Sequence, residues 1–212
     1  MRESEIIATV VQYYEGKLES FGATARGVDW KDEASQTKRF EQFLRLLDIP
    51  DRAGRGSLID FGCGYGALLP FLRACGLDVQ YTGYDPSPRM LDQARAAHQE
   101  ATFTSDWSSV PRADYIVASG VFNVRLETPL DEWRDYVVRT LETIDAKADQ
   151  GWAVNFLTGY ADEERKRPDL FYADPGFFFD WCRRSASRWV SLLHDYDLYE
   201  FTIGVRRRPL SR

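Results

Sequence analysis

Three glycines stand within five positions directly behind an apolar run, in SLIDFGCGYGALLPFL at residues 57–72. Glycine adopts positive φ and carries no Cβ, so a turn built from it lets a ligand approach the main chain closely. Gly62, Gly64 and Gly66 fall where a buried strand would turn into a helix, and ligands of open α/β sheets bind at that edge. The pattern indicates the floor of a nucleotide-type pocket, with a tight structural turn as the alternative.

Two acidic residues follow the next two predicted strands. Asp85 in YTGYDPSP comes 23 positions after Gly62, where an acid can accept hydrogen bonds from ribose hydroxyls. The alternative role for Asp85 is to cap the following helix, although Ser87 could fill that position equally well. Asp106 in TFTSDW closes the third strand, where an adenine amino group would lie, and Trp107 could pack on the ring. A surface turn is the alternative there.

The composition narrows the class of protein. A chain of 212 residues suits one domain with a sizeable core. Acids outnumber bases 33 to 27, which argues against a nucleic-acid binder. The three cysteines form no CxxC pair, and the sequence offers no clear set of metal ligands. No apolar run approaches the ~20 residues of a membrane span and the start does not read as a signal peptide, so we expect a cytoplasmic protein.

Short strand-like and helix-like segments alternate from Ser57 onward. We predict strands at 58–61, 79–84, 102–104, 115–119 and 152–157, and helices at 66–75, 87–98 and 129–147. This alternation predicts a parallel sheet with helices on both faces. The runs WVSLLHDY and YEFTIGVRR are joined by so short a turn that they can only form an antiparallel hairpin. Two amphipathic helices, at 3–19 and 33–48, precede the sheet.

The ordered series IDFGCGYG, YTGYDPSPRM, TSDW, ADYIVASGVF and the C-terminal hairpin resembles the class I S-adenosylmethionine-dependent methyltransferases. The resemblance covers residues 35–207. It implies an α/β fold, namely a Rossmann-like doubly wound sheet, mostly parallel with an antiparallel C-terminal hairpin strand, preceded by N-terminal helices. It also implies S-adenosyl-L-methionine as the cofactor, a helical lid at residues 1–50 and one compact cofactor-binding domain at residues 51–212.

The resemblance places the cofactor against residues at the ends of the strands and in the lid. Those residues are Asp60 near the ammonium group, Gly62, Cys63 and Gly64 along the methionine part, Asp85 at the ribose, Pro86 and Met90 beside the adenine, Asp106 and Trp107 at its polar edge, and Ser119 near the methyl group. In the lid, Trp30 could attract the sulfonium and Arg39 could pair with the cofactor carboxylate. Ordinary helix packing is the alternative for both.

Methyl transfer is a one-step displacement that depends mainly on alignment and on the exclusion of water. If the acceptor is a hydroxyl, a base must take its proton, and His194 beside the hairpin turn is the candidate. The candidate substrate-binding residues are Tyr14, Phe122, Asn123, Tyr172 and Tyr196. After the fourth strand the chain reads SGVFN, without the Asn/Asp-Pro-Pro-aromatic run of enzymes that methylate exocyclic or amide nitrogens. We therefore expect a small-molecule acceptor, with oxygen favoured over nitrogen.

Two other functions stay open at this point. The chain could be a non-catalytic S-adenosylmethionine-binding module, although the set Asp60, Gly62, Gly64 and Asp85 is intact. It could also be an NAD(P)-dependent oxidoreductase that uses a G-x-G-x-x-A turn ending at Ala67, but such folds usually begin with their glycine turn, and here 56 residues precede Ser57. The sequence does not indicate an oligomeric state.

Overall fold

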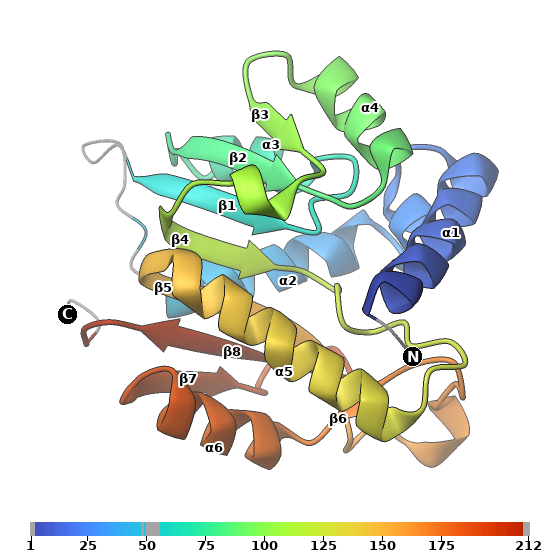
Figure 1. Cartoon of the computed structure of the whole chain (residues 1–212), viewed down its shortest axis with the longest axis vertical. Helices are drawn as coiled ribbons and strands as arrows, with labels where there is room; N and C mark the ends of the chain where they lie inside the picture. The colour runs from blue at the N-terminus through green and yellow to red at the C-terminus, as the bar shows by residue number, and fades with distance from the viewer. Residues whose placement is uncertain (1–2, 48, 50–55, 210–212) are drawn as a thin grey trace.

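The computed structural model describes residues 3–47, 49 and 56–209. Its centre is one mixed sheet with strand order β3-β2-β1-β4-β5-β8-β7, and a short strand β6 pairs with β5 away from this path (Figure 1). The strands are β1 (Ser57–Phe61), β2 (Gln80–Tyr84), β3 (Thr102–Thr104), β4 (Ala113–Ala118), β5 (Ala148–Thr158), β6 (Tyr172–Ala173), β7 (Trp189–Leu193) and β8 (Glu200–Arg206).

The directions of the strands confirm the predicted fold class. All pairs among β1 to β5 are parallel, whereas β8 runs antiparallel to β5 and β7 runs antiparallel to β8. As a result β7 points the same way as the first five strands. The carboxyl ends of β1, β2 and β4 all point toward α1 in Figure 1, and in open α/β sheets this is the ligand-binding edge.

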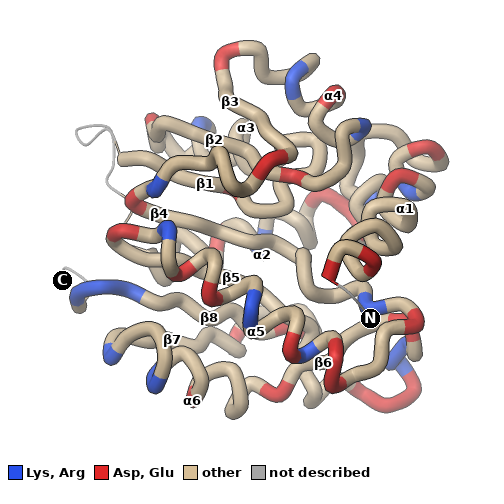
Figure 2. The backbone as a smooth tube through the Cα atoms, in the orientation of Figure 1, with Lys and Arg blue, Asp and Glu red and all other residues tan. Residues whose placement is uncertain are grey.

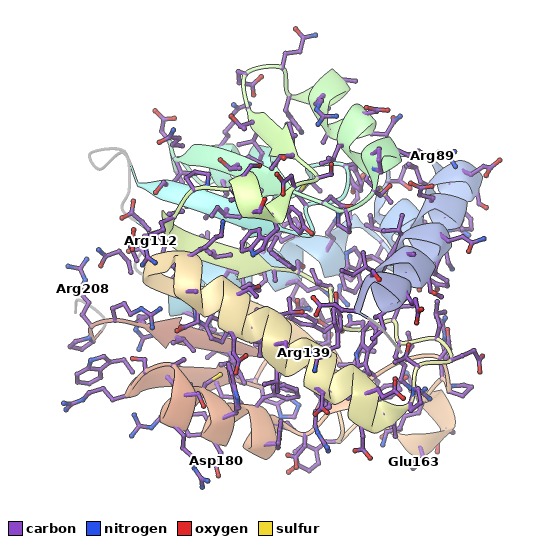
Figure 3. All side chains as sticks on the ribbon, viewed as in Figure 1. Arg89, Arg112, Arg139, Glu163, Asp180 and Arg208 are labelled. Atoms are coloured by element: carbon purple, nitrogen blue, oxygen red, sulfur yellow. The ribbon has the colours of Figure 1, made fainter. Side chains whose placement is uncertain are left out.

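Helices cover both faces of the sheet. They are α1 (Glu3–Phe21), η1 (Ala25–Val28), α2 (Glu33–Leu46), α3 (Leu68–Ala74), α4 (Pro88–Ala97), η2 (Trp107–Ser109), α5 (Leu130–Lys147), η3 (Glu163–Arg165) and α6 (Pro175–Ser185). One apolar core joins the sheet to α5 and α6, and a second joins it to α2, α3 and α4. Side chains fill both layers, while Arg139 on α5 and Asp180 on α6 project outward (Figure 3).

Alternation along the strands explains how one sheet serves two cores. In β5, Trp152 and Val154 contribute to the core under α5 and α6, while Ala153 between them contributes to the core under α2 and α3. Successive side chains of a strand point to opposite faces, so a strand covered on both sides carries apolar residues at nearly every position. This is why the apolar runs of the sequence were reliable signals of buried strands.

β8 departs from its sequence pattern. Its polar residues alternate with apolar ones, as in a half-exposed strand, yet every residue of β8 is buried. The polar face is covered by α2, and a Cβ on Gly204 would lie 2.7 Å from the Cβ of Leu46. Basic residues follow at the end of β8 (Figure 2).

The element boundaries differ in a few places. α3 begins at Leu68, not at residue 66, because Gly66 has φ of +85° and belongs to the turn. β5 extends over 148–158, and the two-residue strand β6 was not predicted. The predicted end of the second helix near Pro50 lies outside the described residues, as does the boundary between residues 50 and 51 that separates the predicted lid from the cofactor-binding domain.

Candidate active site

The glycine turn after β1 forms a concave segment of main chain. Gly62, Gly64 and Gly66 have φ of +75°, +53° and +85°, values that favour glycine. The N–H groups of Gly62 and Cys63 donate to the carbonyl oxygen of Tyr84 at 2.7 and 2.9 Å, which fixes the turn against β2. A Cβ on Gly62 would lie 2.5 Å from Cγ2 of Val121. The turn therefore has room only for glycine at its closest approach to the loop after β4.

Asp85 lies beside this turn at the end of β2. Its carboxylate accepts hydrogen bonds from the N–H of Gly64 at 2.8 Å and of Ser87 at 2.9 Å. Ser87 Oγ accepts from the N–H of Met90 at 3.2 Å, so Ser87 caps α4. Burial raises the pKa of Asp85 to about 6. No ion pair joins Asp85 to another described side chain, and its carboxylate faces a hollow next to the turn.

Two further polar side chains, Asp60 and Ser119, are buried next to the turn and make few hydrogen bonds within the described residues. Asp60 is 4% exposed and accepts one hydrogen bond from the Tyr81 hydroxyl at 2.7 Å. Burial raises the pKa of this carboxyl to about 7. Ser119 Oγ at the end of β4 is buried and makes no hydrogen bond within the described part of the chain. Such groups are expected where a polar ligand completes the hydrogen bonding.

A hollow connects these groups. It holds about 570 Å³ of empty space, part of it open to solvent, and is lined by the glycine turn, Asp85, Pro86, Met90 and Ser119. A second hollow continues from Gly62 and Ser119 toward Asp60 and Cys63. We call the two together the cofactor cradle, defined by Asp60, Gly62, Gly64, Asp85 and Ser119. Its size is that of a small-molecule or cofactor site.

Of the two residues predicted at the polar edge of the adenine, Trp107 lines a hollow and Asp106 does not. Trp107 lines a third hollow together with Pro86 and packs on Phe61 with ring centroids 4.8 Å apart. Asp106 is exposed, and its carboxylate accepts from the N–H of Ser108 at 2.9 Å as the cap of η2. The contacts of Asp106 in the structure are those of the surface-turn alternative, and its role toward adenine stays a prediction.

The N-terminal segment forms one wall of the cradle. Val10, Val11 and Tyr14 of α1 line the hollow, as does Trp30 in the loop before α2. The indole of Trp30 lies against Gly120, where a Cβ would be 2.2 Å from Cζ2 of the ring. These contacts put α1 and Trp30 beside the cradle, and the role of the segment as a lid stays a prediction.

Arg39 has a partner that the sequence analysis did not single out. Its Nε donates to both carboxylate oxygens of Glu200, at 2.9 and 3.0 Å, and its Nη2 contacts the same carboxylate. The guanidinium carbon lies 3.7 Å from the ring centroid of Trp30. Glu200 also accepts from Asn155 Nδ2 at 2.6 Å, and Asn155 Oδ1 accepts from the N–H of Gly120 at 2.8 Å. The counter-ion of Arg39 is therefore Glu200, and its predicted pairing with the cofactor carboxylate gains no support.

A further hollow adjoins the cradle through Tyr14, Val28 and Trp30, which line both. It holds about 470 Å³, including space open to solvent. We call it the acceptor chamber, defined by Tyr14, Asp29, Lys31, Arg39, Asn123, Arg167 and Glu200. Of the residues predicted to contact substrate, Tyr14 and Asn123 lie on its wall.

The other predicted substrate residues, Phe122, Tyr172 and Tyr196, line neither the cradle, nor the hollow beside Trp107, nor the acceptor chamber. Phe122 is fully buried in the core and stacks on Phe156 with ring centroids 5.5 Å apart. The Tyr172 hydroxyl accepts from the N–H of Arg167 at 2.9 Å. The Tyr196 hydroxyl shares a hydrogen bond with Thr202 Oγ1 at 2.8 Å. These contacts hold the three side chains in place, and their role toward a substrate stays a prediction.

His194 follows β7 at the predicted edge of the sheet, but it is exposed and also lies outside the hollows described above. Its ring contacts those of Tyr160 and Phe201, with centroids 5.9 and 6.2 Å apart. The edge was predicted correctly, because β7 is parallel to β1. Chain order could not give the distance from the chamber, and the role of His194 as a base stays an untested prediction.

The raised pKa of Asp60 predicts a pH dependence of stability. A carboxyl with a raised pKa in the folded state stabilises the fold while it is protonated, and this contribution is lost as pH rises through about 7. Between pH 5.5 and 8 the ligand-free protein should lose about 2 kcal/mol of unfolding free energy from this group. Urea unfolding at the two pH values measures the change. The pKa of Asp85 is also raised, so Asp85 contributes a loss of stability in the same direction. The contribution of Asp60 is therefore measured as the difference between the wild type and Asp60→Asn. If the variant loses as much unfolding free energy as the wild type, the change does not come from Asp60.

Comparison with known proteins identifies the family. A family model described as a methyltransferase domain matches residues 32–175, more than half of the chain. The chain therefore belongs to the methyltransferase domain family. It is an S-adenosylmethionine-dependent methyltransferase, and S-adenosylmethionine is its cofactor.

Individual proteins agree with this assignment. The "Putative methyltransferase Rv1506c" of Mycobacterium tuberculosis (strain ATCC 25618 / H37Rv) is 48% identical over 165 residues, covering 76% of this chain and 99% of the relative. Magnesium protoporphyrin IX methyltransferase (ChlM) from Synechocystis PCC 6803 with bound SAH has a TM-score of 0.62 at 14% identity, covering 97% of this chain and 98% of that one. The DhpI-SAM-HEP complex has a TM-score of 0.61 at 16% identity, covering 94% and 96%. The two solved structures support the fold.

Two features are absent from the part of the chain that the structure describes. No helix there is both long enough and apolar enough to cross a membrane. No group of three or more His, Cys, Asp or Glu side chains there is arranged to hold a metal ion.

Proposed function

We propose that this methyltransferase transfers the methyl group of S-adenosylmethionine to an oxygen atom of a small molecule held in the acceptor chamber. The observation that carries the proposal is that the cofactor cradle and the chamber lie side by side and share Tyr14, Val28 and Trp30 as lining residues. A hollow of about 470 Å³ suits a small molecule, and walls from α1, α2 and the loops after β4 and β5 surround it.

The cradle residues fit the cofactor by their chemistry. The main chain of Gly62 and Gly64 permits close approach, Asp85 offers acceptors for the ribose hydroxyls, and buried Asp60 offers a negative charge for the ammonium group. The buried Ser119 hydroxyl, which has no partner among the described residues, can bond a polar group of the cofactor. When bound, the cofactor supplies an activated methyl group. The protein positions the acceptor and excludes water around it.

Two observations favour oxygen as the accepting atom. The loop after β4 reads SGVFN and lacks the proline-containing run of enzymes that methylate exocyclic or amide nitrogens. One structural neighbour is the mitomycin 7-O-methyltransferase MmcR, with a TM-score of 0.58 at 13% identity, covering 98% of this chain and 69% of that one.

The proposal is tested by transfer of a labelled methyl group. The protein is incubated with S-adenosylmethionine labelled in the methyl group and with a metabolite extract of bacterial cells, and low-molecular-weight products are separated by chromatography. A labelled small molecule with an oxygen–methyl bond supports the proposal. Cofactor binding without any labelled product would favour the non-catalytic module, and an N-methyl product would contradict the choice of oxygen. His194→Ala is expected to leave the rate within twofold, since the ring lies outside the chamber, whereas a loss of tenfold or more would establish the predicted base.

A further inference from the structure

Several charged residues line the acceptor chamber, and most of them form ion pairs. Asp29 is bound by Lys17 at 2.7 Å and accepts a hydrogen bond from the Tyr13 hydroxyl at 2.7 Å. Glu200 is bound by Arg39 through the two-oxygen contact described above. Each carboxylate of the chamber is therefore paired with a cation of this chain.

More basic than acidic residues line the chamber. Lys31, Arg39 and Arg167 line it against Asp29 and Glu200. Arg167 is shared between Asp169, at 2.5 Å, and Asp29, at 3.6 Å. The Lys31 side chain makes no ion pair and no hydrogen bond with the described residues. The surplus cation is Lys31, an exposed residue on the rim of the chamber whose charge also acts on the adjacent Asp32, in a protein whose net charge is -6.

One more donor lies between the chamber and the cradle. Tyr14 lines both, and its hydroxyl makes no hydrogen bond to the described residues. Burial raises the pKa of this phenol, so it stays protonated and can only donate to an anionic acceptor at neutral pH. Histidine is also missing from the lining of the chamber as far as the structure describes it. Apart from the carboxylates of Asp29 and Glu200, which are held in ion pairs, the described lining of the chamber offers donors and cations.

From this arrangement we infer that the accepting oxygen belongs to a carboxylate, which Lys31 holds by charge, and that the product is a methyl ester. The inference rests on the proposed function and specifies its substrate class. A carboxylate is already ionised at neutral pH, so it needs no base. An electron pair of the carboxylate oxygen forms the new O–C bond, the C–S bond breaks with its pair remaining on sulfur, and no proton is released. The positive sulfonium and the negative carboxylate give two neutral products.

The experiment uses the chemistry of esters. The metabolite extract is divided by anion exchange into an acidic pool and a neutral-and-basic pool, and each is incubated with the protein and methyl-labelled S-adenosylmethionine. Methyl esters release volatile labelled methanol in dilute alkali, whereas methyl ethers and N-methyl groups do not. We expect label only from the acidic pool, in a form that alkali converts to methanol.

Variants of Lys31 test the recognition. With the acceptor purified from the acidic pool, Lys31→Gln should raise its KM about tenfold, while kcat and the thermal shift given by S-adenosylmethionine stay close to wild type. Lys31→Arg should restore most of the loss. Lys38→Gln is the matched control, because Lys38 on α2 is partly exposed, lies 3.6 Å from Asp197 and does not line the chamber.

The remaining outcomes separate the two proposals. An alkali-stable product from the neutral-and-basic pool, or an unchanged KM in Lys31→Gln, would overturn the carboxylate inference and leave methyl transfer to a small molecule intact. Absence of label from both pools, in a protein that the cofactor stabilises thermally, would contradict the proposed function and this inference with it.

Discussion

Asp85→Ala is expected to abolish the thermal stabilisation that S-adenosylmethionine gives to the protein. The ribose hydroxyls would lose a charged acceptor, and a hydrogen bond to a charged group contributes about 1.5–3 kcal/mol. Two such bonds correspond to at least a hundredfold weaker binding. At a concentration of 100 Kd the cofactor stabilises the wild type by about 2.7 kcal/mol, and a hundredfold loss would leave about 0.4 kcal/mol. Differential scanning fluorimetry with and without cofactor measures the difference.

The control for this prediction is Asp92→Ala. Asp92 lies on α4 close to Asp85 in sequence, is exposed, and contacts Arg95 at 3.4 Å. Removing it changes the net charge by the same amount without touching the cradle, so the cofactor shift should persist. Asp85→Asn should retain part of the shift, because its amide oxygen can still accept. A full cofactor shift in Asp85→Ala would refute the ribose assignment and with it the central feature of the proposed site.

Glu200→Ala is expected to destabilise the protein by about 3–5 kcal/mol, the cost typical of removing one partner of a buried ion pair. Arg39 and Glu200 are 6% and 1% exposed, so the guanidinium would be left buried without a counter-ion. Asn155 would lose the acceptor for its amide as well. Urea unfolding at pH 7 measures the free energy. The same variant should lower the melting temperature by roughly 6–20 °C for a chain of this size.

Two comparisons make this prediction specific. Glu100→Ala removes the partner of Arg73, an ion pair in which both side chains are about half exposed, and should cost at most ~1 kcal/mol. Replacing both partners, Arg39→Met with Glu200→Leu, should recover most of the stability lost in the single variant, because no isolated charge remains. If the double variant folds but turns over slowly, the pair also holds Trp30 in place. A cost below 1 kcal/mol in Glu200→Ala would contradict the geometry.

The sequence predicted those parts of the fold that depend on local patterns. Apolar runs located the buried strands, and the short C-terminal turn required an antiparallel pair. Gly62 and Asp85 were identified for a similar reason, since a turn of positive-φ residues and an acid at a strand end are both visible within a few positions. Ser87 was recognised as a possible cap from its place before the helix, and it does cap α4.

The rest of the site depends on contacts between distant residues. Arg39 and Glu200 are 161 positions apart, and no period or motif connects them. Lys31 and Arg167 meet at the chamber only because the loops around α2 and η3 converge there. Glu200 left one faint signal, since it is the single acid among the polar residues that alternate with apolar ones along β8.

The sequence also could not predict toward which side a residue in a loop points its side chain. Phe122 follows β4 at the correct edge, but Gly120 has φ of +73°, and after this turn Phe122 enters the core. Chain order gives the edge at which a residue emerges. It does not give the face toward which the side chain turns, because that depends on backbone angles that only glycine makes accessible.

The burial of the polar face of β8 under α2 has a consequence for how the enzyme matures on the ribosome. Residues near position 40 cannot reach their final environment until the segment around position 200 has been synthesised, since Glu200 neutralises Arg39 and Arg39 supports Trp30. Nearly the whole polypeptide must therefore emerge before the wall beside Gly120 is set. Nascent chains that stop short of β8 would carry an uncompensated guanidinium and an incomplete chamber, which makes the last strand the step that completes the catalyst.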